Sequence, residues 1–208
     1  MNTIHSVTLE VADPAAARQF HDSAFGLGPE VAVRASDAPT TGFRGFTLSL
    51  VVPQPATVRR LVDAALAAGA TSLKPVSKSL WGHSGVVEAP DGTIWKVATS
   101  AKKDTGPDTG QVDVVALLLG VEDVAATKRF YVDHGLVVGK SFGSRYVEFD
   151  NGSGAVKLGL YRRKALAKDA GVASDGEGSH RLAIGSDLGA FTDPDGFAWE
   201  TVTQPASS

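Results

Sequence analysis

The sequence predicts an α+β protein made of two related halves, and three observations support this. Residues 6–21 (SVTLEVADPAAARQFH) and 116–131 (ALLLGVEDVAATKRFY) are identical at six of sixteen positions at an offset of 110. Residues 89–99 (APDGTIWKVAT) also match 193–203 (DPDGFAWETVT) at an offset of 104. Strand and helix patterns both recur within each half. Repeated units of this kind predict mixed sheets with helices packed on one face of each.

Each copy opens with a strand followed by a capped helix. Residues 7–11 alternate apolar and polar side chains, which is the period of a half-buried strand. Asp13 stands at the N-cap position and Pro14 at the first helical position, so a helix is expected from there through Phe20. The second copy repeats the pattern with Asp123 as the cap.

The rest of the first half predicts a second helix between strands. Apolar residues at i, i+3, i+4, i+7 and i+8 from Val58 predict a helix over 55–68, which ends at Gly69. Strands are expected at 46–52, 71–76, 84–88 and 93–99.

The second half is rich in strand patterns and lacks a full counterpart of the helix at 55–68. A short helix is expected over 164–170. Each half is therefore trimmed in a different place. The strands are expected at 136–142, 145–149, 156–161 and 180–185.

The domain boundary is predicted at a polar segment, SAKKDTGPDTGQ, which contains Gly and Pro and has no periodicity. We expect a first domain over 1–100, a linker over 101–111 and a second domain over 112–205.

Composition excludes several classes of function. The chain has 208 residues, 43% of them hydrophobic and 21% charged, with a net charge of −3 that is well mixed along the sequence. A nucleic-acid footprint is therefore not expected. Without cysteine there is no disulfide or thiolate chemistry. No apolar run approaches the ~18 residues of a membrane span and no signal peptide is evident, so we expect a cytoplasmic protein without a membrane partner.

These motifs resemble the paired βαβββ modules of the vicinal oxygen chelate superfamily, which includes glyoxalases, bleomycin-resistance proteins and dioxygenases. The resemblance is carried by residues 6–21, 116–136, 80–97 (LWGHSGVVEAPDGTIWKV) and 191–200 (FTDPDGFAWE). It implies tandem βαβββ-type modules whose curved mixed sheets form a cup, with helices on the outer faces and a ligand inside. It does not select one activity, because the superfamily hosts isomerases, dioxygenases, transferases and non-catalytic binders.

The resemblance also implies where a metal would be held. Metal-dependent members place a His on the first strand, a second His on the strand before the second helix, and a Glu on the last strand. The corresponding positions hold Ser6 and Ala116, then Phe46, then Lys96 and Glu200. A divalent ion needs three or four converging N or O ligands, so the first half is expected to have lost its site.

Glu200 is the candidate catalytic residue. A general base at this position would need a pKa raised by burial in an apolar cup. The alternative is a structural pair with a neighbouring Arg. His180 lies close to a ligand position of the family and is a candidate for ligand binding. We expect no cofactor, with a divalent metal on His180 and Glu200 as the alternative.

Two further ligand-binding candidates lie in the segment LWGHSGVV. Trp81 has no repeat-equivalent tryptophan, whereas Trp95 and Trp199 are equivalent to each other and are expected in the core. Trp81 is therefore the predicted aromatic contact. His83 is expected in a glycine-flanked loop, either as a ligand contact or proton carrier or as a solvated side chain.

The remaining candidates lie on predicted strands. Lys96 could bind an anionic group of a ligand, or pair with Glu200 across the two halves. Tyr146 and Tyr161 could line the cup of the second half.

Three functions stay open at this point. The first is a metal-independent protein that binds an amphipathic or apolar small molecule, either to sequester it or to support an acid–base step through Glu200. The second is a metal-dependent glyoxalase-like lyase or dioxygenase. The third is a degenerate, non-catalytic interaction protein. The trimmed copies also leave a homodimer open.

Overall fold

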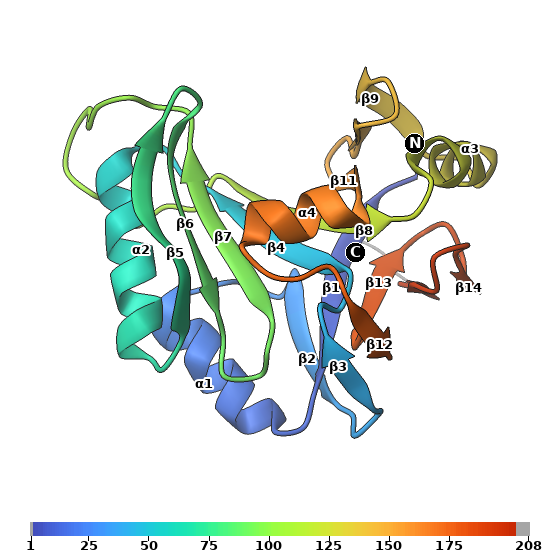
Figure 1. Ribbon diagram of the computed structural model, residues 1–208, viewed down its shortest axis with the longest axis horizontal. Coiled ribbons are helices and arrows are strands. Elements are labelled where there is room, and N and C mark those ends of the chain that lie inside the picture. The colour runs from blue at the N-terminus through green and yellow to red at the C-terminus, as the bar shows by residue number, and fades with distance from the viewer. Residues whose placement is uncertain (1, 203–208) are drawn as a thin grey trace, which may run out of the picture.

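The computed structural model describes residues 2–202, so the last residues of the predicted second domain, 203–205, lie outside the described part. The helices are α1 (Pro14–Ala24), α2 (Pro55–Ala67), α3 (Val124–Asp133) and α4 (Arg163–Ala170). The strands are β1 (Ile4–Val11), β2 (Val31–Ala35), β3 (Thr40–Gly42), β4 (Phe46–Val51), β5 (Thr71–Ser79), β6 (Gly82–Glu88), β7 (Ile94–Thr99), β8 (Val114–Val121), β9 (Val137–Phe142), β10 (Tyr146–Asp150), β11 (Val156–Arg162), β12 (Gly176–Gly178), β13 (Leu182–Ser186), β14 (Phe191–Thr192) and β15 (Ala198–Thr201). The predicted α+β class is confirmed (Figure 1).

An eight-stranded sheet contains two complete βαβββ modules. Its order is β5-β6-β7-β4-β8-β11-β10-β9. The module β4-α2-β5-β6-β7 comes from the first half and has β4 parallel to β7. The module β8-α3-β9-β10-β11 comes from the second half and has β8 parallel to β11. The two modules meet through the antiparallel pair of β4 and β8, where Leu48 faces Leu117.

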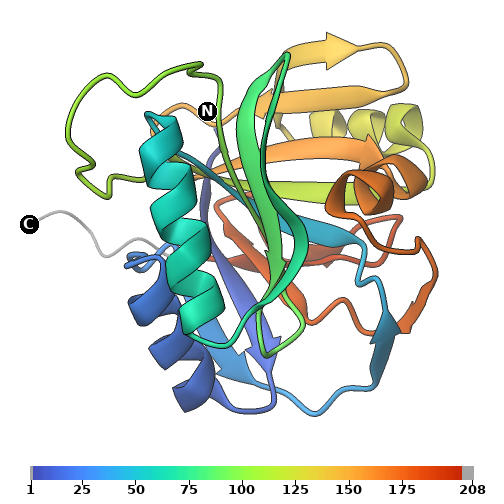
Figure 2. The ribbon, with the colours of Figure 1, turned by 60° about the vertical axis from the view of Figure 1, so that its left-hand side comes forward.

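A five-stranded sheet contains the two trimmed modules. Its order is β14-β15-β13-β1-β2, and the halves meet again through an antiparallel pair, here of β1 and β13. The turn at 187–190, between β13 and β14, contains no helix, so the predicted lack of a counterpart to α2 is confirmed. Each sheet is therefore built by both halves of the chain (Figure 2).

A single large apolar cluster fills the space between the two sheets and the helices α1, α2 and α3. It joins side chains from both halves, including Leu48, Trp95, Leu117 and Trp199, which are all buried. The core position predicted for the two tryptophans is confirmed. Full burial of such a side chain contributes about 1.5–3 kcal/mol, so the halves stabilise each other across this core.

The two repeated helices begin where the sequence predicts. The Asp13 carboxylate accepts hydrogen bonds from the amides two and three residues ahead, both at 3.0 Å. Asp123 does the same at 2.9 and 3.1 Å. These bonds satisfy amides that have no partner within the helix, which explains why both helices start directly after an Asp.

The segment predicted as a linker runs along α2. Arg59 holds Asp104 at 2.8 Å and Arg60 holds Asp108 at 2.7 Å. The Gln54 side chain also bonds the backbone at 105–107. This segment is thus fixed to the first half before β8 begins.

Two features of the first half differ from the sequence prediction. The short strands β2 and β3 were not expected. His83 was expected in a loop but lies in β6, which starts at Gly82. The glycines around it serve packing: a Cβ added at Gly85 would lie 2.9 Å from Val76 and 3.0 Å from Val62.

Among residues 2–202, no helix is both long enough and apolar enough to cross a membrane.

Candidate ligand site

The eight-stranded sheet carries α2 and α3 on one face and α4 on the other, which we call the cup face (Figures 1 and 2). α4 packs Leu166, Ala167 and Ala170 into a second apolar cluster with Val86 and Ile94 of the sheet. This helix from the second half therefore covers part of the cup.

The close approach of α4 depends on a glycine of β8. A Cβ added at Gly120 would lie 3.0 Å from the Cα of Arg163 and 3.3 Å from the side chain of Leu166. Arg163 fixes the start of the helix, since its guanidinium donates to the carbonyl oxygens of Phe43 and Ser174.

A hollow of about 510 Å³ remains on the cup face beside the end of α4. The strands β4 to β7, the β5–β6 turn and Asp169 of α4 surround it. Three of the residues predicted to contact a ligand, Trp81, His83 and Lys96, line this hollow. The structure therefore brings together side chains that sequence analysis proposed separately.

Two lysines, Lys74 and Lys96, and the carboxylate of Asp169 line the hollow. The Lys96 Nζ lies 2.7 Å from the Asp169 Oδ2. The Lys74 Nζ donates to the backbone carbonyls of Lys168 at 2.8 Å and Asp169 at 2.6 Å. The alternative pairing of Lys96 with Glu200 is wrong, because α4 supplies the carboxylate instead. Two ammonium groups against one carboxylate leave the hollow with a net positive charge.

Trp81 lies in the tight turn between β5 and β6, and His83 is the second residue of β6. Trp81 is 87% exposed, and its neighbour Leu80 is exposed as well. The His83 Nδ1 lies 3.3 Å from the carbonyl oxygen of Ala101. A large exposed aromatic side chain at a hollow offers apolar surface that a ligand can cover.

Tyr146 and Tyr161 lie on the cup face in the second half but do not line this hollow. Their ring centroids are 4.7 Å apart, and the Tyr146 hydroxyl donates to Glu148 at 2.9 Å. Gly159 makes space for them, since a Cβ there would lie 3.1 Å from the Tyr146 ring.

Burial raises the pKa of both tyrosines. For Tyr146 the hydrogen bond to Glu148 raises the pKa further, and for Tyr161 the charges of Asp169 and Glu148 do so. Both phenols are therefore protonated at neutral pH, and the Tyr146 hydroxyl donates to Glu148.

His180 lies outside the cup, before β13 and not within a strand. Its Nδ1 and Nε2 face the carbonyl oxygens of Arg44 at 2.5 Å and Asp195 at 2.9 Å. The ring stacks on Phe197 with 3.9 Å between centroids. Because backbone carbonyls already occupy both nitrogens, this imidazole is placed to join loops of the two halves.

Glu200 lies on β15 of the five-stranded sheet, away from the eight-stranded cup. Arg34 holds its carboxylate at 2.9 and 3.2 Å and also bonds Glu10 at 2.6 Å. These two carboxylates raise the pKa of Arg34. The Glu200 side chain is 45% exposed. Its role as a general base remains a prediction, in surroundings unlike the apolar cup that the prediction assumed.

The middle of the cup face does not fit a divalent metal. Lys96, Ser49, Ala116 and Lys157 lie side by side on β7, β4, β8 and β11. Two ammonium groups repel a cation, and a hydroxyl and a methyl cannot replace His or Glu ligands. Throughout residues 2–202, no three His, Asp or Glu side chains group closely enough to hold an ion.

Sequence analysis missed Lys74 and Asp169. One signal was present: Asp169 stands in the last turn of α4, where the helix dipole disfavours a negative charge. An acidic residue at this end indicates a nearby cation, although the sequence alone does not identify it as Lys96.

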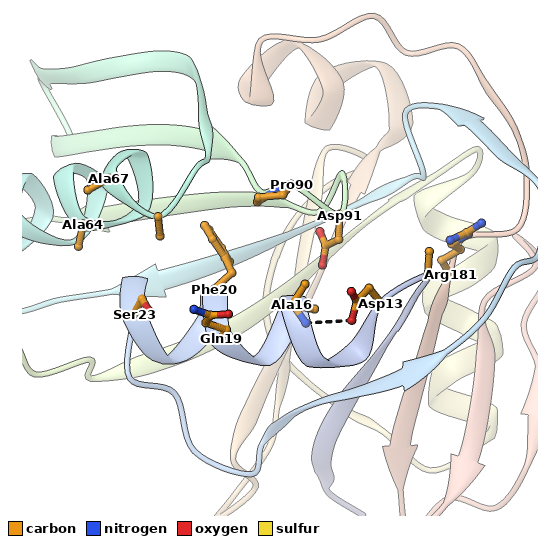
Figure 3. A pocket seen from close by; sticks show the side chains of 13 residues that line it. Asp13, Ala16, Gln19, Phe20, Ser23, Ala64, Ala67, Pro90, Asp91 and Arg181 are labelled. Atoms are coloured by element: carbon orange, nitrogen blue, oxygen red, sulfur yellow. Dashed lines mark hydrogen bonds between the residues drawn. The ribbon is translucent and has the colours of Figure 1, made fainter.

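A larger hollow of about 920 Å³ lies between α1 and α2 (Figure 3). Small side chains such as Ala16 line most of it, together with Phe20. The charged groups Asp13, Asp91 and Arg181 lie toward one end, and Gln19 and Ser23 lie farther along α1. Asp13 caps α1, Arg181 bonds backbone carbonyls and the Asp91 Oδ1 accepts from a turn amide, whereas the buried Asp91 Oδ2 has no hydrogen-bond partner within the described residues. The smaller hollow is the candidate ligand site, because charged, polar and aromatic side chains line it together.

No protein-family model and no curated protein matches the sequence. Solved structures do match. The structure of glyoxalase I from Zea mays superposes with a TM-score of 0.63 at 14% identity, covering 97% of this chain and 92% of that chain. A proposed dioxygenase from Bacillus subtilis gives 0.61 at 12% identity, covering 98% and 85%. Identities this low show the fold alone, which agrees with the module order described above. The chain therefore has the vicinal oxygen chelate fold. Two complete modules form the eight-stranded sheet, and two trimmed modules form the five-stranded sheet.

Proposed function

We propose that the protein binds a small molecule in the hollow of the cup face, without a catalytic metal. The observation that carries this proposal is the convergence of Trp81, His83 and Lys96 on one hollow of about 510 Å³. Small-molecule sites have volumes of about 300–1,000 Å³ and combine apolar surface with a few placed polar groups. The hollow meets both criteria.

The side chains of the cup face support metal-independent binding. Lys96 and Lys157 stand in the central row of the cup face, where their ammonium groups repel a cation. The reactions named for the maize and Bacillus relatives belong to those proteins. The proposal for this chain includes no lyase or dioxygenase reaction, because the central row of its cup face holds Lys96, Ser49, Ala116 and Lys157 and not a set of cation ligands.

Binding in the hollow does not involve Glu200. This carboxylate is paired with Arg34 on the other sheet. The proposed role is therefore capture of a small molecule, with Lys96 as the charged contact and Trp81 as the apolar one.

A thermal-shift screen over metabolites and aromatic antibiotics, run with a chelator present, tests the proposal. Ser84 lines the cup hollow and Ser23 lines the groove between α1 and α2, so the two positions make a matched pair. Ser84→Trp should abolish the stabilisation by ligands, and Ser23→Trp should leave it unchanged. The proposal would be contradicted if ligands still stabilised Ser84→Trp but no longer stabilised Ser23→Trp. It would also be contradicted if ligands stabilised the protein only after a metal was added.

A further inference from the structure

The end of α4 places a carboxylate of the chain itself in the proposed ligand site. Asp169 is the residue before the last of α4, and its Oδ2 lies 2.7 Å from the Lys96 Nζ. The negative end of the helix dipole disfavours a carboxylate there, so Lys96 holds this group against the local field. The Asp169 side chain is 47% exposed and the Lys96 side chain 25% exposed. The pair is therefore accessible from solvent.

Lys74 anchors the same end of the helix in a different way. Its ammonium bonds the backbone carbonyls of Lys168 and Asp169 and does not depend on the Asp169 side chain. Leu166 and Ala170 also hold α4 on the sheet. The Asp169 carboxylate can consequently leave Lys96 while the helix stays in place.

An exposed ion pair of this type contributes little to stability, because water and salt screen it. Another oxyanion of suitable size can therefore compete for Lys96. Around it, Trp81 and Val51 supply exposed apolar surface.

The geometry points to a ligand with a carboxylate or phosphate group on an aromatic or similar apolar body, bound by exchange of its oxyanion for the Asp169 carboxylate on Lys96. This inference rests on the proposed function and adds the chemical class of the ligand. In this inference the Asp169 carboxylate competes with the oxyanion of the ligand for Lys96. Removal of the Asp169 charge therefore strengthens ligand binding.

The test uses three probes with the same ring: benzoate, phenyl phosphate and benzyl alcohol. Each is titrated into the ¹⁵N-labelled protein at low ionic strength, and amide shifts are followed by NMR. Both anions should shift the amides of Lys96, Asp169 and their neighbours, and benzyl alcohol should bind at least about fivefold more weakly. The ratio between benzoate and phenyl phosphate shows which oxyanion the site prefers.

Single substitutions then test the roles of Asp169 and Lys96 one at a time. Asp169→Asn should tighten benzoate binding by about two- to tenfold, and Lys96→Met should weaken it by at least a similar factor. Lys96→Arg keeps the charge and should retain binding even if Lys96→Met folds poorly. Lys164→Met, at an exposed position of the same helix, is the matched control and should change nothing.

The outcomes distinguish this inference from the proposed function. If benzyl alcohol shifts the same amides as strongly as benzoate, and neither charge variant matters, the ligand class is wrong while binding in the cup stands. If Asp169→Asn binds benzoate more weakly than the unmodified protein, the Asp169 carboxylate does not compete with the ligand for Lys96. If no probe shifts any amide of the cup, both the inference and the proposed function fail.

Discussion

The ammonium of Lys96 on β7 lies 2.7 Å from the carboxylate of Asp169 on α4. This contact links a complete module of the first half to a helix of the second half. The proposed ligand site therefore combines the complete module of the first half with the end of α4 from the second half.

Gly120→Val should displace α4. The added side chain meets the Cα of Arg163 and the backbone oxygen of Gly45, at 3.0 and 3.2 Å for the Cβ alone. Overpacking of this kind costs about 1–3 kcal/mol. Urea denaturation should show the loss, with faster amide exchange over 163–170. Gly106→Ala is the control, because a Cβ there meets nothing within 4 Å; equal effects of both changes would refute this account of α4.

Tyr131→Phe should destabilise the protein by about 1–3 kcal/mol, because it leaves the Oδ2 of a buried carboxylate without this donor, while backbone amides still bond its Oδ1. The Tyr131 hydroxyl donates to Asp193, and both groups are buried. Tyr146→Phe removes a half-buried bond to Glu148 and should cost less, about 0.5–1.5 kcal/mol. Guanidinium denaturation of the two variants checks the order, and the reverse order would contradict it.

Stability should fall as pH drops below about 6.5, in part through His21. Burial lowers the pKa of this imidazole from 6.5, although Asp91 and Asp22 partly oppose the shift. Between the lowered folded pKa and 6.5 the unfolded chain binds more protons, so the free energy of unfolding rises with pH across this window.

His21→Phe removes this contribution and keeps an aromatic ring beside Trp95, whose centroid lies 5.4 Å away. Urea denaturation at about pH 5 and pH 7.5 should then give a smaller difference than in the unmodified protein. An unchanged difference would show that His21 does not contribute.

Trp81 should act as the fluorescent reporter of the site. It is strongly exposed, whereas Trp95 and Trp199 are buried. Acrylamide should quench the Trp81 emission selectively, and Trp81→Phe should remove the quenchable component. A ligand in the cup should protect Trp81 from acrylamide. If a ligand found by the screen leaves the quenching unchanged, Trp81 does not contact the bound ligand.

Local patterns in the sequence were sufficient to predict most elements. Alternation located β1, and β4 and β7 were expected as strands near the second helix. The Asp-initiated helices were expected because their caps satisfy amides within the same few residues. The short strands β2 and β3 were missed because their partners, β1 and β12, are set by long-range pairing.

The sequence could not predict which sheet each functional side chain joins. Lys96 and Glu200 are equivalent in the repeat, yet β7 lies in the complete sheet and β15 in the trimmed one. Lys96 consequently borders a hollow, whereas Glu200 lies in an exposed ion pair with Arg34. The position of α4 over the cup likewise depends on tertiary packing, because its own residues only predict a short helix.

The most direct test of the account is a crystal structure of the protein grown with saturating benzoate and a chelator, for the unmodified chain and for Asp169→Asn. We expect benzoate on the cup face, with its carboxylate at hydrogen-bond distance from the Lys96 Nζ and its ring near Trp81 or Val51. Benzoate seated in the groove between α1 and α2, or a metal ion held by three or more protein atoms within the cup, would contradict it.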